Sequence, residues 1–432
     1  MPRRNLRCLL LLVLFFAACY QKVPGSRYSR VLADALERVN RRFYLPVDEL
    51  NLFEGAMSGM FETLGDEHSK YVKAVKKPAF EEDLNQEFVG IGIRPAIDPK
   101  TKEFLVLSAL PDGPAAAAGV CAGDRIVKIE GQATQGLSLA DAVKRIRGKP
   151  GTSVTLTVLH RGAVQPVDLS VVREMVHEDT VEGISRDAEG RWNFLLPGGR
   201  RIGYIRIKAF TDTNHGGKNT VADFRAALDS LRGEEFRGLV LDLRDNPGGS
   251  VVAAVDICDM LIPKGEIVTI RGREGRIWEA FRASGRGPVT DFPIAVLVDR
   301  ATASAAEIVA ACLQDHERAI VFGQRSYGKG TVQEVVDLGD KCGAMKLTIA
   351  TYWRPSGQNI NRPKEDAQGA TWGVSPSEGC DLSVDDDERN RLLAWQQERE
   401  LALVSGGKAA GEEVHDRVLL KAVDYLEAKT GD

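Results

Sequence analysis

The chain has 432 residues, of which 43% are hydrophobic and 27% are charged. These proportions are typical of a folded globular protein, and the length is enough for two or three domains. The net charge of −4 is spread along the chain without a basic stripe, so we expect no nucleic-acid partner. The sequence has no Cys-x-x-Cys pair and no His-Glu-x-x-His motif, and we expect no metal and no cofactor.

Residues 1–19 have the features of a signal peptide. Three arginines precede the apolar run Leu9–Ala18, which is too short to span a bilayer comfortably. The tetrapeptide Phe16–Cys19 resembles a bacterial lipobox, in which Cys19 would be lipidated and become the new N-terminus. We leave open lipidation of Cys19 or ordinary cleavage near the same place. Both predict an exported protein in the periplasm or cell envelope, and the first predicts a membrane-anchored lipoprotein, tethered to the membrane.

Residues 20–86 are predicted to be a helical region. Between Tyr28 and Tyr71, apolar residues recur at helical spacing on two successive faces. The first face contains Val31, Leu32, Leu36 and Val39, and the second contains Leu50, Phe53, Met57 and Phe61. The spacing therefore predicts a helical arm ahead of the next domain.

Short strands and turns follow over Phe88–Val172. The glycine-rich segment Val89–Gly92 opens this region, a helix is predicted near Leu139–Arg147, and a strand follows it. Glycines allow successive backbone N–H groups to turn toward an anion such as a peptide carboxylate. The simpler alternative is that Gly90 and Gly92 only shape a turn.

Two apolar runs, Gly238–Leu243 and Ile294–Val298, are predicted to be buried parallel strands. The first is followed by the segment Arg244–Gly249, and the second ends shortly before Ser304. Open α/β sheets place their sites at the carboxyl ends of their strands. The two segments are therefore expected at one edge of a sheet.

The next helix and strand should return the chain to the same edge. A helix from about Ala303 to Asp315 would run roughly 18 Å away from Ser304. The strand Ala319–Phe322, with its flanking residues, would return about the same distance. The loop that carries Lys329 between two glycines would then lie beside Ser304.

A serine and a lysine in this arrangement predict a hydrolase. A serine hydroxyl is a weak nucleophile and needs an adjacent base. Lysine can act as that base only when its amine is neutral, which burial in an apolar pocket favours. Gln333 is the candidate to orient Lys329, and the tetrahedral oxyanion would need two N–H donors. The candidate donors are the backbone N–H groups of Ala305, Gly248 and Gly249.

Each of these features also has a simpler explanation. Ser304 and Glu307 form the Ser-x-x-Glu pattern of a helix capping box. A lysine in a glycine loop is usually a solvated surface charge, and a Gly-Gly pair often marks a tight turn. The combination of all three at compatible spacing favours catalysis.

The sequence resembles the C-terminal processing peptidases, also called tail-specific proteases. The resemblance runs from about Tyr28 to Pro376, and it is carried by three segments that match the family. These are LVLDLRDNPGG, ATASAAEIVAACLQDHERAIVFGQRSYGKGTVQ and LTIATYWRPSGQNI. It implies that Ser304 is the nucleophile, Lys329 the general base and Gln333 its orienter. The substrates would be proteins or peptides with free C-termini.

The resemblance also implies a domain organisation. The fold class would be α/β and multidomain, with a crotonase/Clp-like core of ββα units, an inserted PDZ domain and an N-terminal helical arm. We place the signal peptide at 1–19, the helical region at 20–86, the PDZ domain at 87–175, the Ser-Lys peptidase core at 176–390 and a C-terminal helical tail at 391–432. Val89, Gly90, Ile91 and Gly92 would bind the peptide C-terminus. The arm would pack on the core or on a neighbouring subunit of a homo-oligomer.

The sequence departs from the family pattern in three places. Ala306 stands where the family usually has a second serine, and Asp245 stands where it usually has asparagine. The first change is expected to be harmless, whereas the second adds a carboxylate near the site and could alter the pH dependence. The segment Thr371–Asp387 also differs from the usual family ending.

Three other interpretations are weaker. Gly323–Lys329 begins a phosphate-loop pattern, but the next residue is Gly330 instead of Ser or Thr, and a strand is predicted to follow. A Ser-His-Asp hydrolase would have to use His215, which is the one histidine in a suitable loop. The third alternative is an inactive PDZ-containing peptide-binding scaffold.

Five cysteines follow the signal segment. Cys258 and Cys312 lie in apolar helical segments and are predicted to be core residues. Cys342 and Cys380 could pair in an oxidising compartment. At the end of the chain, Glu412–Lys429 is predicted to be a closing helix.

Overall fold

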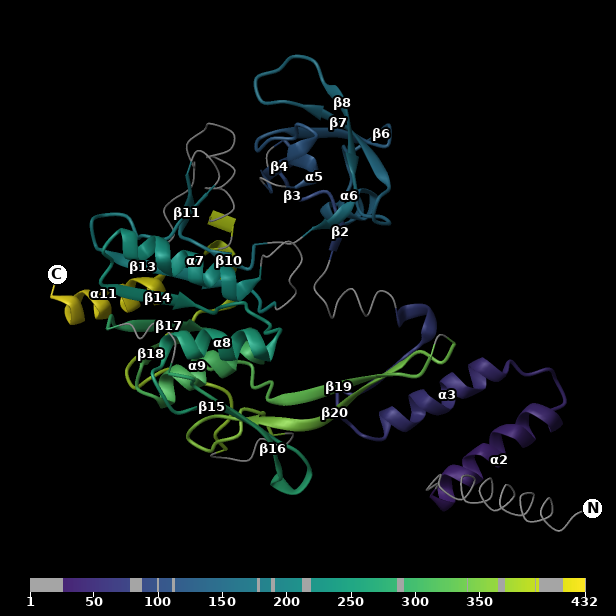
Figure 1. The fold of residues 1–432 in the computed structure, drawn as a ribbon. Coiled ribbons are helices and arrows are strands. Elements are labelled where there is room, and N and C mark those ends of the chain that lie inside the picture. The colour runs from purple at the N-terminus through teal and green to yellow at the C-terminus, as the bar shows by residue number, and fades with distance from the viewer. Residues whose placement is uncertain are drawn as a thin grey trace, which may run out of the picture. The chain divides into compact units, whose positions relative to one another are not determined.

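The computed structural model describes most of the chain after residue 25 (Figure 1). The described residues are 26–77, 88–98, 101–110, 113–176, 179–187, 191–211, 219–285, 291–339, 341–363, 370–392, 394–395 and 415–431. The signal segment, Cys19 and His215 lie outside these ranges. Within them, no helix is both long enough and apolar enough to cross a membrane.

The chain divides into two compact units. The first comprises Met1–Lys77 with Glu334–Leu347, and the second comprises Pro78–Gln333 with Thr348–Asp432. The sequence-based domain boundaries stay predictions.

The first unit contains the predicted helical arm. Helices α2 (Arg27–Arg42) and α3 (Glu49–Glu62) begin at the N-caps Ser26 and Asp48, whose side chains accept backbone N–H groups. A 3₁₀ turn, η1, covers Ala74–Lys76. Strand β1 (Lys70–Val72) pairs antiparallel with the first residues of β20 (Ala344–Trp353).

The region after residue 88 forms a small β domain, as the sequence predicts. Strand β2 (Phe88–Gly90) pairs with β9 (Glu174–Val176). A separate sheet has the order β3-β4-β5-β7-β8, with β6 paired to β5. Its strands are β3 (Ile93–Ile97), β4 (Phe104–Ala109), β5 (Arg125–Ile129), β6 (Gln132–Ala133), β7 (Ser153–Leu159) and β8 (Val167–Val172), and its helices are α5 (Pro114–Ala117) and α6 (Leu139–Ile146). Alternating residues of these strands fill one core, as in β7, where Val154, Leu156 and Val158 are buried.

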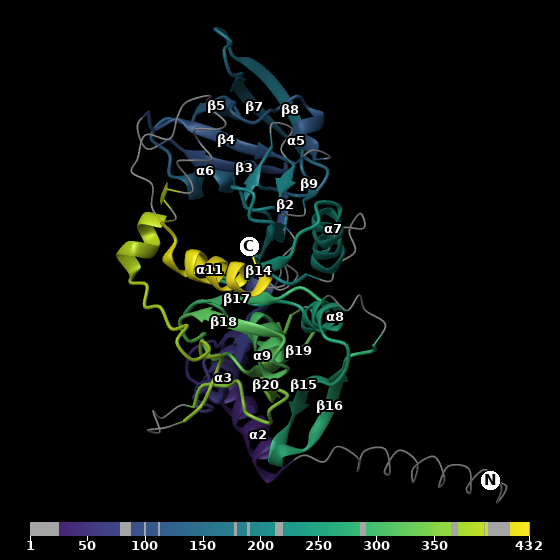
Figure 2. The same cartoon turned by 90° about the vertical axis from the view of Figure 1, so that its left-hand side faces the viewer.

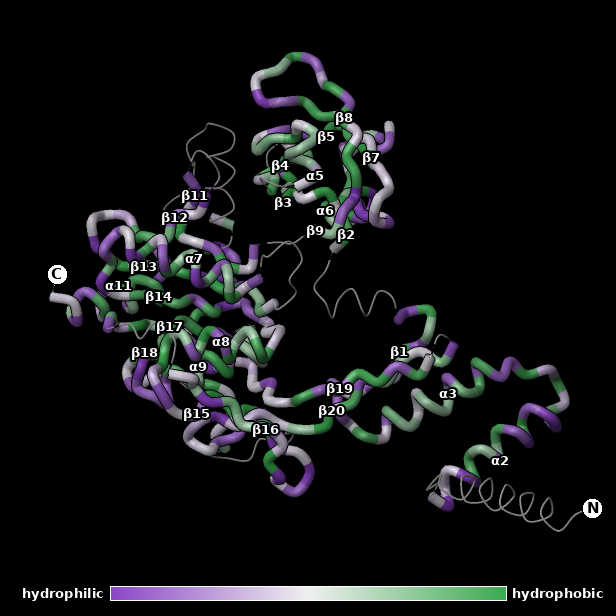
Figure 3. Tube along the Cα trace, in the orientation of Figure 1, coloured by the Kyte–Doolittle hydropathy of each residue, from purple (hydrophilic) through white to green (hydrophobic). Residues whose placement is uncertain are grey.

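The centre of the second unit is a five-stranded sheet with the order β10-β13-β14-β17-β18. The strands are β10 (Val181–Glu182), β13 (Ile202–Ile207), β14 (Gly238–Asp242), β17 (Ile294–Val298) and β18 (Ala319–Gly323). The last four are mutually parallel, and β10 is antiparallel to β13. All residues of β14 and β17 are buried, as expected for strands covered on both faces, and the hydropathy of β17 in Figure 3 agrees. A two-stranded sheet, β11 (Ser185–Arg186) with β12 (Trp192–Asn193), lies between β10 and β13 in sequence.

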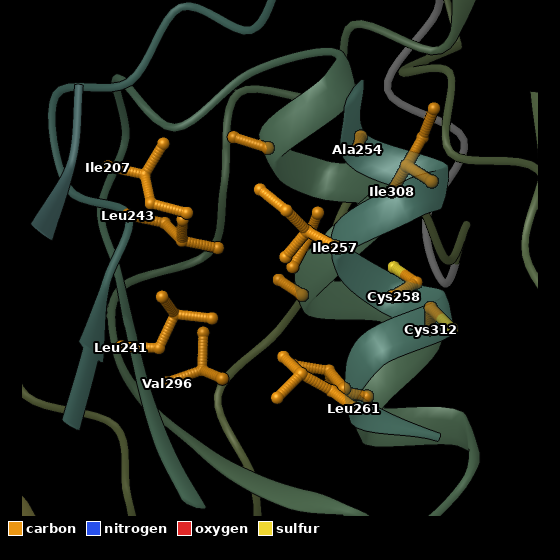
Figure 4. Packing of buried hydrophobic residues seen from close by; sticks show 14 of the residues in the cluster. Ile207, Leu241, Leu243, Ala254, Ile257, Cys258, Leu261, Val296, Ile308 and Cys312 are labelled. Carbon is orange, nitrogen blue, oxygen red and sulfur yellow. The ribbon is translucent and has the colours of Figure 1, made fainter. Parts of the chain in front are cut away.

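Helices cover both faces of this sheet. The helices α7 (Thr220–Gly233), α8 (Val251–Leu261) and α9 (Ala305–Asp315) share one apolar cluster with strand residues such as Leu241 and Val296. Figure 4 shows this packing, including Cys258 and Cys312, which are buried as predicted. Alternate strand residues such as Val240 and Leu297 share a second apolar cluster with α11 (Arg417–Thr430). Figure 2 shows α11 beside β14 and β17. The closing helix is therefore confirmed, although it begins later than the predicted Glu412.

A β-hairpin and a long strand complete the second unit. Strands β15 (Glu266–Arg271) and β16 (Ile277–Arg282) are joined through the 3₁₀ turn η2 (Arg273–Gly275), and β15 pairs with the last residues of β20. Strand β19 (Thr331–Asp337) also pairs with β20. Because a strand follows Lys329 where a phosphate loop requires a helix, the phosphate-loop alternative is wrong. Cys342 and Cys380 are both free thiols, so the suggested pairing is absent.

Candidate active site

Ser304 occupies a strained position at the start of a helix. It is the N-cap of α9, with φ of 56° and ψ of −119°, a conformation that non-glycine residues rarely adopt. The preceding loop holds this conformation in place: the Thr302 hydroxyl donates to the Leu243 carbonyl at 2.9 Å, and Asp299 Oδ1 accepts the Thr302 N–H at 2.9 Å. Strain maintained by surrounding contacts is common at functional sites.

Lys329 lies in a loop that requires glycine on both sides. Gly328 has φ of +84°, and a Cβ there would lie 2.5 Å from the Trp372 ring. A Cβ on Gly330 would lie 2.1 Å from the Asn361 nitrogen. The Lys329 side chain is half-buried, and its amine has no ion pair or hydrogen bond with another described residue. The loop therefore presents an uncompensated amine from a tightly packed backbone.

Glu307 joins the two predicted catalytic residues. Its Oε2 accepts the backbone N–H of Ser304 at 2.8 Å and the backbone N–H of Lys329 at 2.8 Å. Its Oε1 accepts the Gly328 N–H at 2.7 Å and the Ser326 hydroxyl at 2.5 Å. The capping interaction that the sequence indicates is present, but the same carboxylate also holds the lysine loop. The structure therefore brings the backbones of Ser304 and Lys329 to one oxygen atom.

The Glu307 carboxylate is fully buried. Burial raises its pKa from 4.5 to about 7, while hydrogen bonds from Ser326, Gly328, Ser304 and Lys329 act in the opposite direction. The effect of desolvation on the pKa of Glu307 therefore outweighs the opposite effect of its four hydrogen-bond donors. The ionisation of this group falls in the neutral range, directly behind the predicted nucleophile.

The glycine turn after β14 lies against Ser304. Gly248 has φ of +102°, and a Cβ there would lie 2.7 Å from the Ser304 Cβ and 3.0 Å from the Ala305 nitrogen. The Gly248 N–H donates to Asn246 Oδ1 at 2.8 Å. Among the described residues, the N–H groups of Ala305 and Gly249 donate to no acceptor. The N–H groups of Ala305 and Gly249 are therefore available to an oxyanion, whereas the Gly248 N–H would first have to give up its hydrogen bond to Asn246.

Gln333 lies on β19, close to the lysine loop in sequence. Its Nε2 donates to the hydroxyl groups of Thr331 at 2.7 Å and Thr348 at 3.3 Å. Within the described part of the chain it makes no hydrogen bond to the Lys329 amine. Its role as orienter stays a prediction.

Asp245, the carboxylate that departs from the family pattern, is neutralised by arginines. It pairs with Arg206 at 3.5 Å and also with Arg389. Nearby, burial would raise the pKa of the Asp242 carboxyl, but Arg244 and Arg206 outweigh this effect and hold it below its ordinary value. The turn that carries the glycines is therefore surrounded by charges that are paired.

The predicted carboxylate-binding segment lies in the small β domain. Val89 and Gly90 belong to β2, whereas Ile91 and Gly92 form the connection to β3. The Ile91 side chain is buried, its carbonyl accepts the Ala115 N–H at 2.8 Å, and Gly92 has φ of +74°. The N–H groups of Ile91 and Gly92 donate to no other described residue. These two N–H groups are therefore available to donate hydrogen bonds to an anionic ligand.

The sequence signals for histidine chemistry find no support at this site. His316 lies at the far end of α9, where its Nε2 contacts the Glu266 carbonyl at 2.7 Å. His215 is outside the described residues. The sequence pattern indicates Glu307 only as a possible cap, whereas in the structure its carboxylate also holds the loop that carries Lys329.

Comparison with known proteins identifies two domain families. The model of peptidase family S41 matches residues 201–374, which include Ser304 and Lys329. A PDZ domain model matches residues 105–159, within the small β domain.

Full-length relatives agree with these matches. A carboxy-terminal-processing protease of Bartonella bacilliformis is 39% identical over 332 residues, covering 76% of this chain and 71% of that protein. The carboxy-terminal processing protease CtpA of Bacillus subtilis is 33% identical over 403 residues, covering 92% and 81%. A solved structure of a putative S41 protease from Bacteroides fragilis has a TM-score of 0.50 and 16% identity over 87% of this chain and 90% of that chain, and it supports the fold alone.

Proposed function

This chain belongs to the carboxy-terminal-processing serine proteases of peptidase family S41, and we propose that it cleaves peptide bonds with Ser304 as nucleophile and Lys329 as general base. One observation carries this assignment. Glu307 Oε2 accepts the backbone N–H groups of both residues at 2.8 Å, so the two side chains originate from adjoining backbones. The Lys329 amine, which pairs with no described residue, and the strained Ser304 backbone support the same roles.

The reaction would have two stages. The Ser304 hydroxyl oxygen attacks the substrate carbonyl while its proton passes to the neutral Lys329 amine. The resulting oxyanion is stabilised by the N–H groups of Ala305 and Gly249, and the lysine then protonates the leaving amine. In the second stage, Lys329 takes a proton from a water molecule that attacks the acyl-serine ester, and it returns a proton to the Ser304 oxygen as the ester bond breaks and the new carboxyl end of the product leaves. Because the lysine must begin neutral, activity should rise with pH, and a flat profile from pH 5 to 9 would count against it.

We further propose that the PDZ domain selects unstructured C-terminal tails. Among the described strands, β3 pairs with β4 only, which leaves its other edge for a peptide strand, and α6 contacts β3. The N–H groups of Ile91 and Gly92, which precede β3 and donate to no other described residue, would donate to the terminal carboxylate. A tail bound in this way would bring its parent protein to the peptidase core.

Export, membrane tethering and self-association are also part of the proposal. The N-terminal sequence supports export to the periplasm or cell envelope, and Cys19 is the proposed site of a lipid anchor. The side chains of Tyr28, Val31 and Leu32 on α2 are 81%, 58% and 50% exposed, which favours burial against a second copy. The parallel sheet with alternating helices supports the assignment of the core to crotonase/Clp-like ββα units.

The experiment that tests the chemistry is cleavage of an unfolded reporter protein with an apolar C-terminal tail. Wild type, Ser304→Ala and Lys329→Ala are compared, and a reporter with a charged tail serves as the control substrate. We expect both variants to lose cleavage while they retain tail binding, measured by fluorescence anisotropy. Cleavage that survives in either variant would place the chemistry elsewhere, and His215 would be tested next. Tail binding without cleavage by wild type would favour the scaffold alternative.

A further inference from the structure

Two charged residues near the C-terminus bind the turn that carries the proposed oxyanion donors. Arg389 lies in a helical segment over residues 386–392, and Asp416 is the N-cap of α11. Arg389 pairs with Asp245, and Asp416 pairs with Arg244. We call Arg389 and Asp416 the C-terminal clasp. Neither residue belongs to the catalytic machinery described above.

The pair between Asp416 and Arg244 is the more buried of the two. Asp416 accepts two hydrogen bonds from the Arg244 guanidinium, at 3.0 and 2.8 Å, and its side chain is only 12% exposed. The same carboxylate caps α11 by accepting the Leu419 N–H at 3.0 Å. Bidentate pairs of this kind fix orientation as well as distance. Asp416 therefore fixes the turn to the beginning of α11.

The pair between Arg389 and Asp245 acts on the next residue. Asp245 has φ of 61°, and its N–H donates to Asp299 Oδ1 at 3.1 Å. Asp299 lies in the loop that leads to Ser304, where Oδ1 also accepts the Ala301 N–H at 3.0 Å. Arg389 thus contacts Asp245, whose backbone hydrogen bond to Asp299 joins the glycine turn to the loop that leads to Ser304. The carboxylate that departs from the family pattern thus has one of its two arginine partners in this C-terminal segment, the other being Arg206.

The described residues leave a space beside these pairs. A cavity of about 300 Å³ is lined by both loops and by the C-terminal segment, including Arg244, Asp245, Asp299 and Arg389. Val418 packs against the sheet and fixes the start of α11. Across the cavity, the ion pairs link the C-terminal segment to the two loops.

We propose that the C-terminal clasp positions the glycine turn, and with it the Gly249 N–H, relative to Ser304. Arg389 and Asp416 are then positioning residues of the reaction, and this inference rests on the proposed function. Only Asn246 and Pro247 separate Asp245 from Gly248, whose Cβ position would be 2.7 Å from the Ser304 Cβ. A shift of the turn by a fraction of an ångström would therefore reach the oxyanion donors. Displacements near 1 Å at such sites reduce rates about 100-fold.

The test uses Arg389→Gln and Asp416→Asn. Asparagine is also a good N-cap, so Asp416→Asn weakens the ion pair while it keeps α11 capped. We expect kcat to fall at least about tenfold in each variant, with KM changed less than about twofold, because the substrate-binding groups stay in place. Arg389→Lys and Asp416→Glu keep the charge and should restore part of the rate.

Two matched variants control for loss of charge in the same segment. Asp386→Asn removes the pair with Arg300, whose side chains are 79% and 59% exposed, and such exposed pairs contribute little. Arg417→Gln removes a pair with Glu388 that lies within the C-terminal segment itself. Both controls should keep the wild-type kcat. Equal losses in the controls and in the clasp variants would mean that the segment acts only through stability, and would overturn the inference.

A salt titration of wild type provides a readout that does not depend on how the variants fold. The Arg389 side chain is 42% exposed, so added salt should screen its pair with Asp245. We expect kcat of wild type to fall with salt more steeply than kcat of Arg389→Gln, and parallel salt profiles would contradict the clasp. Ser304→Ala is measured alongside. If Ser304→Ala still cleaves, the proposed function fails and the inference with it; if it is inactive while both clasp variants keep wild-type kcat, only the clasp fails.

Discussion

Replacing Glu307 with glutamine tests the link between the nucleophile and the base. The carboxylate accepts four hydrogen bonds, two on each oxygen, from Ser304, Lys329, Gly328 and Ser326. A glutamine amide has only one accepting oxygen. If that oxygen faces Ser304 and Lys329, the NH₂ group faces the Gly328 N–H and leaves it without a partner. We expect Glu307→Gln to cost about 1–3 kcal/mol of unfolding free energy, the usual penalty for a buried unpaired polar group.

The pH dependence of stability provides an independent check of the same residue. Because the folded-state pKa is raised from 4.5 to about 7, the folded protein holds the proton more tightly than the unfolded chain does. The resulting stabilisation is fully present below pH 4.5 and is lost as pH rises to about 7. The difference in pKa corresponds to about 3 kcal/mol across this window. Glutamine does not titrate, so this decrease should be absent from Glu307→Gln.

Activity should respond more strongly than stability. Movement of the NH₂ group away from its neighbours would shift the Ser304 or Lys329 backbone, and we expect kcat to fall roughly 10- to 100-fold. The assays are urea unfolding followed by fluorescence at pH 4.5, 6 and 7.5, and cleavage of the tailed reporter at the same pH values. A variant with wild-type kcat, or with the wild-type decrease in stability between pH 4.5 and 7, would refute the role assigned to Glu307.

Three further predictions concern packing and reactivity. Gly248→Ala should abolish cleavage, because the added Cβ would lie 2.7 Å from the Ser304 Cβ. The reporter assay checks this, with circular dichroism as the folding control, and an active, folded variant would contradict it. Leu426→Ala should lower the free energy of unfolding by about 2–5 kcal/mol, because this α11 side chain is fully buried against the sheet; a change near zero in urea unfolding would show that α11 is not part of the core. Cys258 and Cys312 should resist a thiol reagent until the protein is unfolded, because both are buried and burial raises the pKa of Cys258. The exposed Cys121 should react at once. Labelling of the native protein followed by peptide mapping checks this, and modification of Cys258 or Cys312 in the native state would contradict it.

The sequence predicts those parts of the site that depend on local pattern. The helix after Ser304 and the strand before the lysine loop have strong apolar periodicity, and the observed α9 and β18 agree closely with the predicted bounds. The glycines beside Ser304 and Lys329 were also recognisable, because close backbone approach requires glycine. Parallel strand order then brings these segments to one edge.

The parts that the sequence does not predict depend on distant contacts. Glu307 has the local pattern of a capping box, and nothing in that pattern reveals that Gly328 and Lys329 also donate to it. Besides the nearby Asp242, Arg244 pairs with Asp416, 172 residues later in the chain, and a single charge carries no signal of so distant a partner. The Gly248 N–H is engaged by Asn246, a detail of turn geometry that composition does not determine.

The most direct test of the central claim is capture of the acyl-enzyme. A peptide ester substrate is mixed with wild type, quenched in acid within milliseconds to seconds, and the protein is digested and analysed by mass spectrometry. The account predicts that the N-terminal fragment of the substrate is attached to the peptide containing Ser304, and that no adduct forms in Ser304→Ala or at an appreciable rate in Lys329→Ala. An adduct on any other residue, or rapid adduct formation in Lys329→Ala, would contradict it.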